Sequence, residues 1–206
     1  MAVRFLRKWV IENNANTLLK QFIQETGKTE CPVPVEEMVM FLGLSLDYDN
    51  LSQRFGIEGE VLGCLNVETK EIFIEENLLP EVNPLAREGR YRFTVGHETG
   101  HWILHRDLVN DPEQADLFAS QQATIVCQSS SNKPWIEWQA DYFSTCLLMP
   151  RSWIYQTIDR ENLRSLAAEK MVFRISELFE VSKQAAGIRL EELGMIDHSG
   201  RVAIAS

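Results

Sequence analysis

The chain has 206 residues, of which 45% are hydrophobic and 24% charged, a composition typical of one folded domain or of one domain with a small appendage. Thirty acidic side chains against 20 basic ones give a formal net charge of -10, which repels nucleic acid and anionic lipid at long range. Composition and charge therefore exclude wholesale disorder and a fibrous architecture, and they argue against nonspecific binding of polyanions.

The sequence also predicts where the protein works. Its most apolar run, residues 38–44, is far short of the ~18 residues needed to span a bilayer. The first eleven residues mix three cations among their apolar side chains and never form an uninterrupted signal-peptide core. The four cysteines are far apart and include no CxxC pair, which argues against a zinc ribbon or a disulfide framework. We therefore expect a cytoplasmic protein with reduced, buried thiols and no membrane association.

The first third of the chain predicts two helices followed by a small sheet. Apolar residues at helical spacing predict a helix over residues 16–26 and a second one that begins at Pro34 and ends at Gly43. The period then changes to two. Residues 61–66 and 71–75 are β-prone runs that predict a hairpin, and residues 44–48 predict a third strand.

The rest of the chain is predicted to be mostly helical. Helical patterns cover residues 90–105 and 135–148, while residues 107–133, rich in Gln, Ser and Asp, predict a long loop that is either functional or a tolerated surface insertion. Residues 151–206 predict a helix-turn-helix-like pair around Ser182, a candidate N-cap. Residues 160–206 carry seven cations and seven anions, so we favour packing on the core over contact with DNA.

Residues 97–101, His-Glu-Thr-Gly-His, form an HExxH motif. Side chains four residues apart lie on one face of a helix, so His97 and His101 can reach a single zinc ion at ~2.0–2.1 Å. Glu98 is then placed beside the open coordination position, where zinc lowers the pKa of a bound water toward ~7 and a carboxylate can take its proton. The alternative is a solvated face of an amphipathic helix. The motif predicts a zinc site with hydrolytic chemistry.

Two residues compete for the place of the third zinc ligand. Asp107 lies six residues after His101, where one class of zincins has its ligand, but Leu104 stands where that class has the glycine that turns the chain back. Glu137 lies on the second helix, in an ExxxD arrangement that places two carboxylates one turn apart. Glu137 can therefore bind zinc while Asp141 holds the distal N–H of a ligand histidine. We favour Glu137 over Asp107, and over the alternative that the two acids belong to a helix surface.

For further polar residues near the motif, the sequence leaves several roles open. His105 continues the four-residue series, but eight residues of helix rise ~12 Å, so it cannot share a metal with His97. We expect a plain helix-end histidine, with capping or substrate contact as the alternatives. The transition state also needs an oxyanion donor, for which Tyr91, Arg92, Tyr142 and His105 are unranked candidates.

Three segments together resemble the ImmA/IrrE family of zinc metallopeptidases: residues 92–101 (Arg-Phe-Thr-Val-Gly-His-Glu-Thr-Gly-His), residues 137–143 (Glu-Trp-Gln-Ala-Asp-Tyr-Phe) and residues 147–150 (Leu-Leu-Met-Pro). Because members resemble thermolysin-type gluzincins, the resemblance implies His97, His101 and Glu137 as zinc ligands and Glu98 as the base. We expect an α+β fold in which a zincin-like core over residues 1–150, a small antiparallel or mixed sheet packed on the ligand-bearing helices, precedes a helical region over residues 151–206.

The resemblance also implies a function. Better-known members act on helix-turn-helix repressors or regulate their level, and so release mobile-element or stress-response genes. The leading interpretation is a zinc endopeptidase of narrow specificity that cuts a regulatory protein. We expect one zinc per chain, because the sequence shows one three-ligand site, and no direct nucleic-acid binding, because of the negative charge. The alternative is a non-proteolytic zinc-fold regulator or toxin–antitoxin component that binds a transcription factor. Glu98 favours catalysis, because a pure binder needs no base. Asp141, where many members have Asn, and the long 107–133 segment depart from the family pattern.

Overall fold

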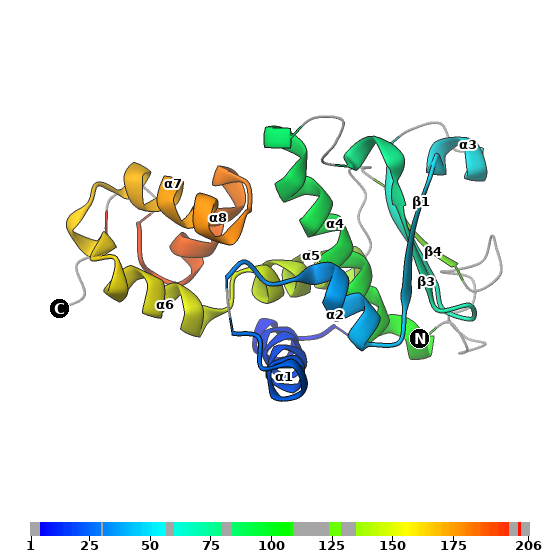
Figure 1. Ribbon diagram of the computed structural model, residues 1–206, viewed down its shortest axis with the longest axis horizontal. Helices are drawn as coiled ribbons and strands as arrows, with labels where there is room; N and C mark the ends of the chain where they lie inside the picture. Colours follow the sequence, from blue (N-terminus) through cyan, green and yellow to red (C-terminus); the bar gives the residue numbers. More distant parts are fainter. Residues whose placement is uncertain are drawn as a thin grey trace.

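A computed structural model describes residues 5–29, 31–56, 60–79, 84–108, 124–128, 135–197 and 202. Helices predominate, and one small sheet lies at the opposite end of the molecule from the last helices of the chain (Figure 1). The long helix α4 (Pro84–His105) and the helix α5 (Trp135–Leu148) run between these two ends. The predicted α+β class with a small sheet is confirmed.

The sheet has four strands in the order β1-β3-β2-β4. Its strands are β1 (Ser45–Asp49), β2 (Val61–Asn66), β3 (Glu71–Glu75) and β4 (Thr124–Gln128). The predicted hairpin is confirmed, since β2 and β3 pair antiparallel around residues 67–70. The predicted third strand is confirmed as β1, which pairs parallel with β3 and so makes the sheet mixed.

The segment expected as a long loop, residues 107–133, contributes a strand. Its described parts are the end of a short 3-10 helix (Arg106–Leu108) and β4, which pairs antiparallel with β2. The run Thr-Ile-Val-Cys-Gln of β4 is β-prone, but it stands among polar residues that predict a loop, and its partner lies about 60 residues away in the sequence. The prediction of a continuous loop was therefore wrong at residues 124–128. The other residues of the segment lie outside the described part.

The helices of the first 150 residues are α1 (Lys8–Thr26), α2 (Val35–Phe41), α3 (Leu51–Phe55), α4 (Pro84–His105) and α5 (Trp135–Leu148). α1 begins well before the predicted residue 16, because Ile11 and Ala15 continue its buried face, whereas Asn13 and Asn14 weaken the helical signal. The short α3 was not predicted. It begins where the Asn50 side chain accepts a hydrogen bond from the Gln53 backbone N–H.

Three helices follow: α6 (Arg151–Arg160), α7 (Ala168–Phe179) and α8 (Lys183–Glu192). The predicted cap is confirmed, since the Ser182 hydroxyl accepts from the Ala185 backbone N–H at 3.1 Å. Buried side chains of α7 and α8, among them Phe179 and Leu190, belong to the same hydrophobic cluster as Phe143 of α5. The last helices therefore pack on the same core as α5.

A buried arginine also fixes the last helix to the first. Arg189 of α8 is 0% exposed. It donates hydrogen bonds to the Met149 carbonyl at 3.2 Å, to Glu12 of α1 at 2.6 Å and to Glu192 at 3.0 Å. A buried guanidinium is costly unless its donors are paired. These contacts therefore tie α8 to α1 and to the end of α5.

The two helices that carry the sequence motifs pack closely together. A Cβ atom at Gly100 of α4 would lie 3.1 Å from the Ala140 Cα and 3.2 Å from its carbonyl oxygen. Ser144 of α5 donates a hydrogen bond to the Phe93 carbonyl of α4 at 2.8 Å. Small residues at the crossing thus let the backbones approach, which brings the HExxH face of α4 against the first turns of α5.

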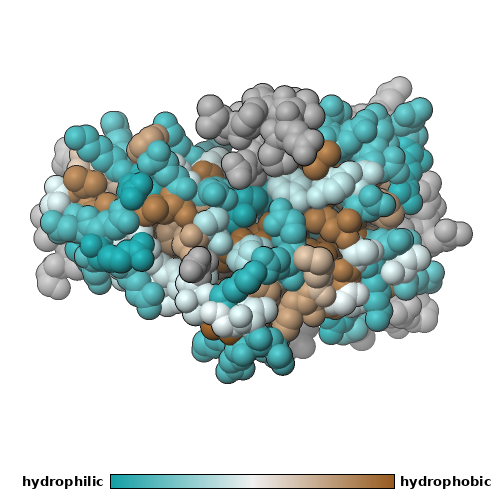
Figure 2. All heavy atoms as spheres, viewed as in Figure 1, coloured by the Kyte–Doolittle hydropathy of each residue, from teal (hydrophilic) through white to brown (hydrophobic). Residues whose placement is uncertain are grey.

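The surface and the thiols complete the description. The face in Figure 2 is largely hydrophilic, and its hydrophobic residues come to the surface in separate patches. No helix in the described ranges is long and apolar enough to cross a membrane. Cys64 and Cys146 are buried and Cys31 is half-buried, and none of the three forms a disulfide with a described residue. The side chain of Cys127 lies outside the described part.

Candidate metal centre

Three side chains from two helices meet in the interior. His97 and His101 come from α4 and Glu137 from the first turn of α5, and they are 1%, 0% and 6% exposed. One nitrogen or oxygen atom from each lies within 4.8 Å of the others. The sequence motifs that suggested a shared site are thus brought together, although 36 residues separate His101 from Glu137 in the chain.

The spacing of these atoms fits a single metal ion. The Nε2 atoms of His97 and His101 lie 2.9 Å apart, and each lies 3.3 Å from a carboxylate oxygen of Glu137. Ligands bound tetrahedrally at ~2.0–2.1 Å stand ~3.3–3.4 Å from one another. Two imidazoles and one carboxylate that converge in this way could bind a metal ion.

The protonation states also suit a cation. Burial lowers the pKa of His101 and keeps its imidazole neutral. Burial alone would raise the pKa of Glu137, but the hydrogen bonds from His101 and His97 outweigh it and hold that pKa well below its usual range. Metal ligands must be a neutral imidazole and an ionised carboxylate, so the group fits the metal that the sequence suggests.

Asp141 lies one turn after Glu137 on α5 and faces the other side of His97. Its Oδ1 is 2.9 Å from the Nδ1 of His97, opposite the Nε2 that meets the cluster. A carboxylate there accepts the Nδ1 proton and leaves the Nε2 lone pair directed at the metal position. The structure thus brings Asp141 and His97 into contact, and the orienting role of Asp141 stays a prediction.

Asp107, the rejected candidate ligand, lies in the 3-10 turn after α4. Its side chain is 95% exposed, and an oxygen of it lies 3.8 Å from Nε of Arg106. It is not one of the three residues whose donor atoms converge.

Glu98 carries a buried carboxyl group that has no hydrogen-bond partner among the described residues. It is 0% exposed, and neither carboxylate oxygen has a hydrogen-bond partner within the described ranges. Burial raises its pKa to about 8; the nearby His97 opposes the rise and Glu137 adds to it. Buried polar atoms are nearly always hydrogen-bonded. Both oxygens of this carboxyl group are therefore available to a group other than the described residues.

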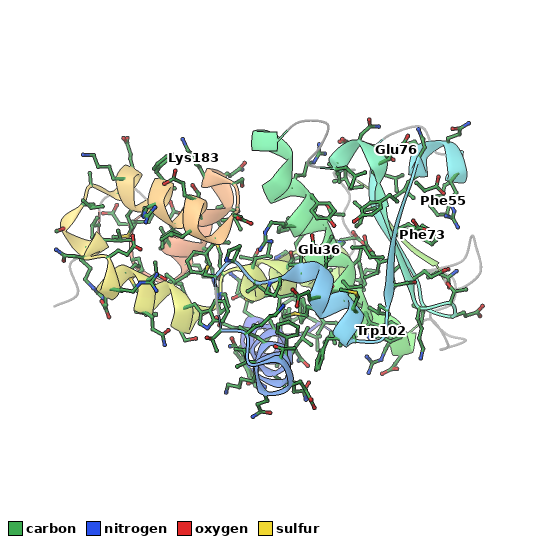
Figure 3. The ribbon with its side chains drawn as sticks, viewed as in Figure 1. Glu36, Phe55, Phe73, Glu76, Trp102 and Lys183 are labelled. Carbon is green, nitrogen blue, oxygen red and sulfur yellow. The ribbon has the colours of Figure 1, made fainter. Side chains whose placement is uncertain are left out.

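The candidates for an oxyanion donor have other partners. The Tyr91 hydroxyl lies 3.0 Å from that of Tyr48, and beside burial and this contact, Glu36 of α2 also raises its pKa; Figure 3 shows Glu36 on the helix that lies against α4. Arg92 donates to the Val33 carbonyl at 2.7 Å. The ring of Tyr142 stacks on Trp138. None of these contacts directs a donor at the three metal-binding atoms.

His105 and Gln139 are polar residues behind the site whose contacts sequence reasoning missed. His105 ends α4, as expected, but it is 1% exposed, and its Nδ1 lies 3.0 Å from the Nδ1 of His101. Its Nε2 lies 3.3 Å from Oε1 of Gln139 on α5. The four-residue spacing from His101 was a signal for the first contact. Nothing local to Gln139 signals the second.

Comparisons with known proteins bear on the family and on the fold. The sequence profile of the IrrE N-terminal-like domain, Peptidase_M78, matches residues 47–191. No curated protein matches the chain. Among solved structures, a Mycobacterium tuberculosis transcriptional regulator matches with a TM-score of 0.52 and 15% sequence identity, over 93% of this chain and 53% of that one. The chain spans about half the length of this neighbour, and at this identity the likeness concerns the fold alone.

Proposed function

Because the chain belongs to the Peptidase_M78 family of IrrE N-terminal-like domains, we propose that it is a zinc-dependent endopeptidase with a zincin-like core. His97, His101 and Glu137 hold the zinc ion. Two neutral imidazoles and one carboxylate at the spacings described are a common donor set of catalytic zinc sites. The contact of Asp141 with His97 supports the same assignment.

When bound, zinc supplies Lewis acidity, which polarises a peptide carbonyl and makes water more acidic. Glu98 supplies the proton transfer. Its carboxylate takes a proton from the attacking water and then delivers it to the departing amine. Asp141 keeps the proton of His97 on Nδ1. The burial of His97, Glu98, His101 and Glu137 excludes bulk water from the reacting groups.

The observation that carries the proposal is the unpaired, fully buried carboxyl group of Glu98. A protein that used the metal only to hold its fold would gain nothing from such a group, and its burial costs free energy. A peptidase gains a base, because a carboxylate with no hydrogen-bond partner among the described residues can take a proton from water. This is why we place catalysis ahead of regulation by binding alone.

We further propose that the substrate is a regulatory protein, in the first place a helix-turn-helix repressor, and that the enzyme acts in the cytoplasm. The family resemblance supports this choice. The net charge of -10 supports a protein partner rather than nucleic acid. We divide the chain into a peptidase unit over residues 1–150 and a helical region over residues 151–206.

Co-expression with a helix-turn-helix repressor encoded beside this protein tests the proposal. The wild type should convert the repressor into a shorter fragment, while Glu98→Gln should leave it intact. Asp107→Ala is the matched control and should cleave normally. An intact repressor that co-purifies with the wild type would contradict the peptidase assignment and support a regulator that acts by binding.

A further inference from the structure

A line of three polar side chains extends from the metal position into the protein. It runs from His101 through His105 to Gln139, with a ring nitrogen of His105 in each contact: Nδ1 to Nδ1 at 3.0 Å and Nε2 to Oε1 at 3.3 Å. His101 and Gln139 are 0% exposed and His105 is 1% exposed. Bulk water therefore does not take the place of any of these contacts.

The contact between the two histidines leaves a choice of proton position. Two ring nitrogens at 3.0 Å need one proton between them, which belongs either to His101 or to His105. If His105 donates it, His101 must carry its own proton on Nε2, the atom that faces Glu137 and His97. If His101 donates it, its Nε2 keeps the lone pair that a metal requires.

Gln139 decides between these two arrangements. Its Oε1 accepts hydrogen bonds only, so the proton of a neutral His105 is drawn to Nε2. The Nδ1 of His105 is then an acceptor, and the shared proton belongs to His101. One amide oxygen on α5 thus determines, two contacts away, which nitrogen of a buried imidazole on α4 is available to the metal.

We propose that His105 and Gln139 are positioning residues that fix the tautomer and the ring orientation of His101 for zinc binding. The proposal rests on the proposed zinc site. It gives the two histidine ligands different supports: the carboxylate Asp141 behind His97, and a neutral imidazole backed by an amide behind His101. α5 then supplies one ligand and, through Asp141 and Gln139, the outer support of the other two.

Loss of the Gln139 oxygen should act on the metal without touching a ligand. In Gln139→Leu, His105 is free to carry its proton on Nδ1, and two N–H groups would then face each other at 3.0 Å. His101 can relieve this contact only by turning its ring or by moving its own proton to Nε2, and either change weakens zinc binding. Partners of this kind are typically worth 10- to 100-fold in metal affinity.

Zinc affinity of the purified full chain, measured by competition with a chromophoric chelator, tests the chain of contacts. Gln139→Leu should weaken binding by about 10- to 100-fold, whereas Gln139→Glu, which keeps an acceptor oxygen, should stay much nearer the wild type. Gln24→Leu on the exposed face of α1 is the matched control. Equal affinities of the wild type and Gln139→Leu would overturn the proposal.

The double variant of His105→Leu and Gln139→Leu shows whether the two residues act in series or independently. Since Gln139 acts through His105, adding Gln139→Leu to His105→Leu should cost no further affinity. Additive losses of zinc affinity would refute the proposal that Gln139 acts through His105. A wild type that binds no zinc would instead refute the metal site, so the two failures are distinguishable.

A measurement on the wild type guards against variants that fail to fold. Long-range proton–nitrogen NMR spectra of the zinc-loaded protein should show His101 protonated on Nδ1 and His105 protonated on Nε2. A proton on Nδ1 of His105 would overturn the proposal whatever the variants show.

Discussion

Gly63 of β2 lies against the carboxyl group of Glu98, so closely that a Cβ atom at this position would stand 2.6 Å from Oε1 of Glu98 and 2.8 Å from Cγ2 of Thr94. Glycine leaves the volume into which the buried carboxyl group extends. The sheet thus shapes the space around the proposed base, although none of the three proposed zinc ligands lies on a strand.

Gly63→Ala should therefore displace Glu98 and slow cleavage, while the zinc ligands stay in place. A displacement of about 1 Å can cost roughly 10²-fold in rate. Zinc content and kcat/KM measured together check this prediction. Gly187→Ala is the control, because a Cβ atom there meets nothing nearer than 4.0 Å. Normal activity of Gly63→Ala would show that the carboxyl group does not need this space.

Glu98→Gln should separate binding from chemistry. Glutamine keeps the size of the side chain but cannot take a proton, so cleavage should fall by about 10²- to 10⁴-fold with one zinc still bound. The variant should then hold the substrate and act as a trap. Cleavage at the normal rate would show that Glu98 is not the base, and full relief of repression without cleavage would favour regulation by contact.

Metal analysis should find about one zinc per chain. Glu137→Ala removes one of three donors and should lower zinc occupancy sharply, whereas Asp107→Ala, with its side chain 95% exposed, should not. Chelation should also lower the unfolding temperature, because a ligand bound only to the folded state stabilises it. The opposite ranking of the two variants would place the third ligand at the end of α4.

Acid should destabilise the contact between the first and last helices. Burial raises the pKa of Glu12, but its hydrogen bonds with Arg189 and Arg151 prevail and leave it below 4.5. Burial also raises the pKa of Glu192, but hydrogen bonds with Lys8, Tyr142 and Arg189 outweigh it and lower that pKa. The ionised forms thus stabilise the fold above pH 4.5, and this contribution is lost as the pH falls through the lowered values. Urea unfolding of the wild type and of Glu12→Gln between pH 3 and 7 measures this contribution. The free energy of unfolding should fall less with acid in the variant than in the wild type.

Arg189→Met tests the same contact by removing the cation. Breaking a buried pair typically costs about 3–5 kcal/mol, and we expect a loss in free energy of unfolding toward the low end because Glu12 keeps Arg151 as a partner. The double variant with Glu12→Gln should recover part of the loss. Conversely, an unchanged free energy of unfolding in Arg189→Met would show that the tie between α8 and α1 contributes nothing.

Local patterns predicted most of the elements and the candidate metal-binding group, but not α3, β4 or the contacts that support the group. HExxH and ExxxD fix which side chains share a helix face, so the convergence of His97, His101 and Glu137 follows once α4 packs on α5. β4 was missed because its strand is completed only by pairing with β2. The contacts of Gly63 and Gln139 were missed for the same reason, since both depend on where a distant helix or strand lies.

The close crossing at Gly100 and Ala140 bears on how activity could be switched. A backbone contact of this kind has no side chain that can change rotamer to let the helices part, so we expect α4 and α5 to move together as a rigid pair. The three atoms that could bind a metal come from both helices, so they should keep their mutual distances through such a motion. A signal that activates the proposed peptidase should therefore act by admitting or excluding the substrate, and should not assemble or dismantle the proposed metal centre.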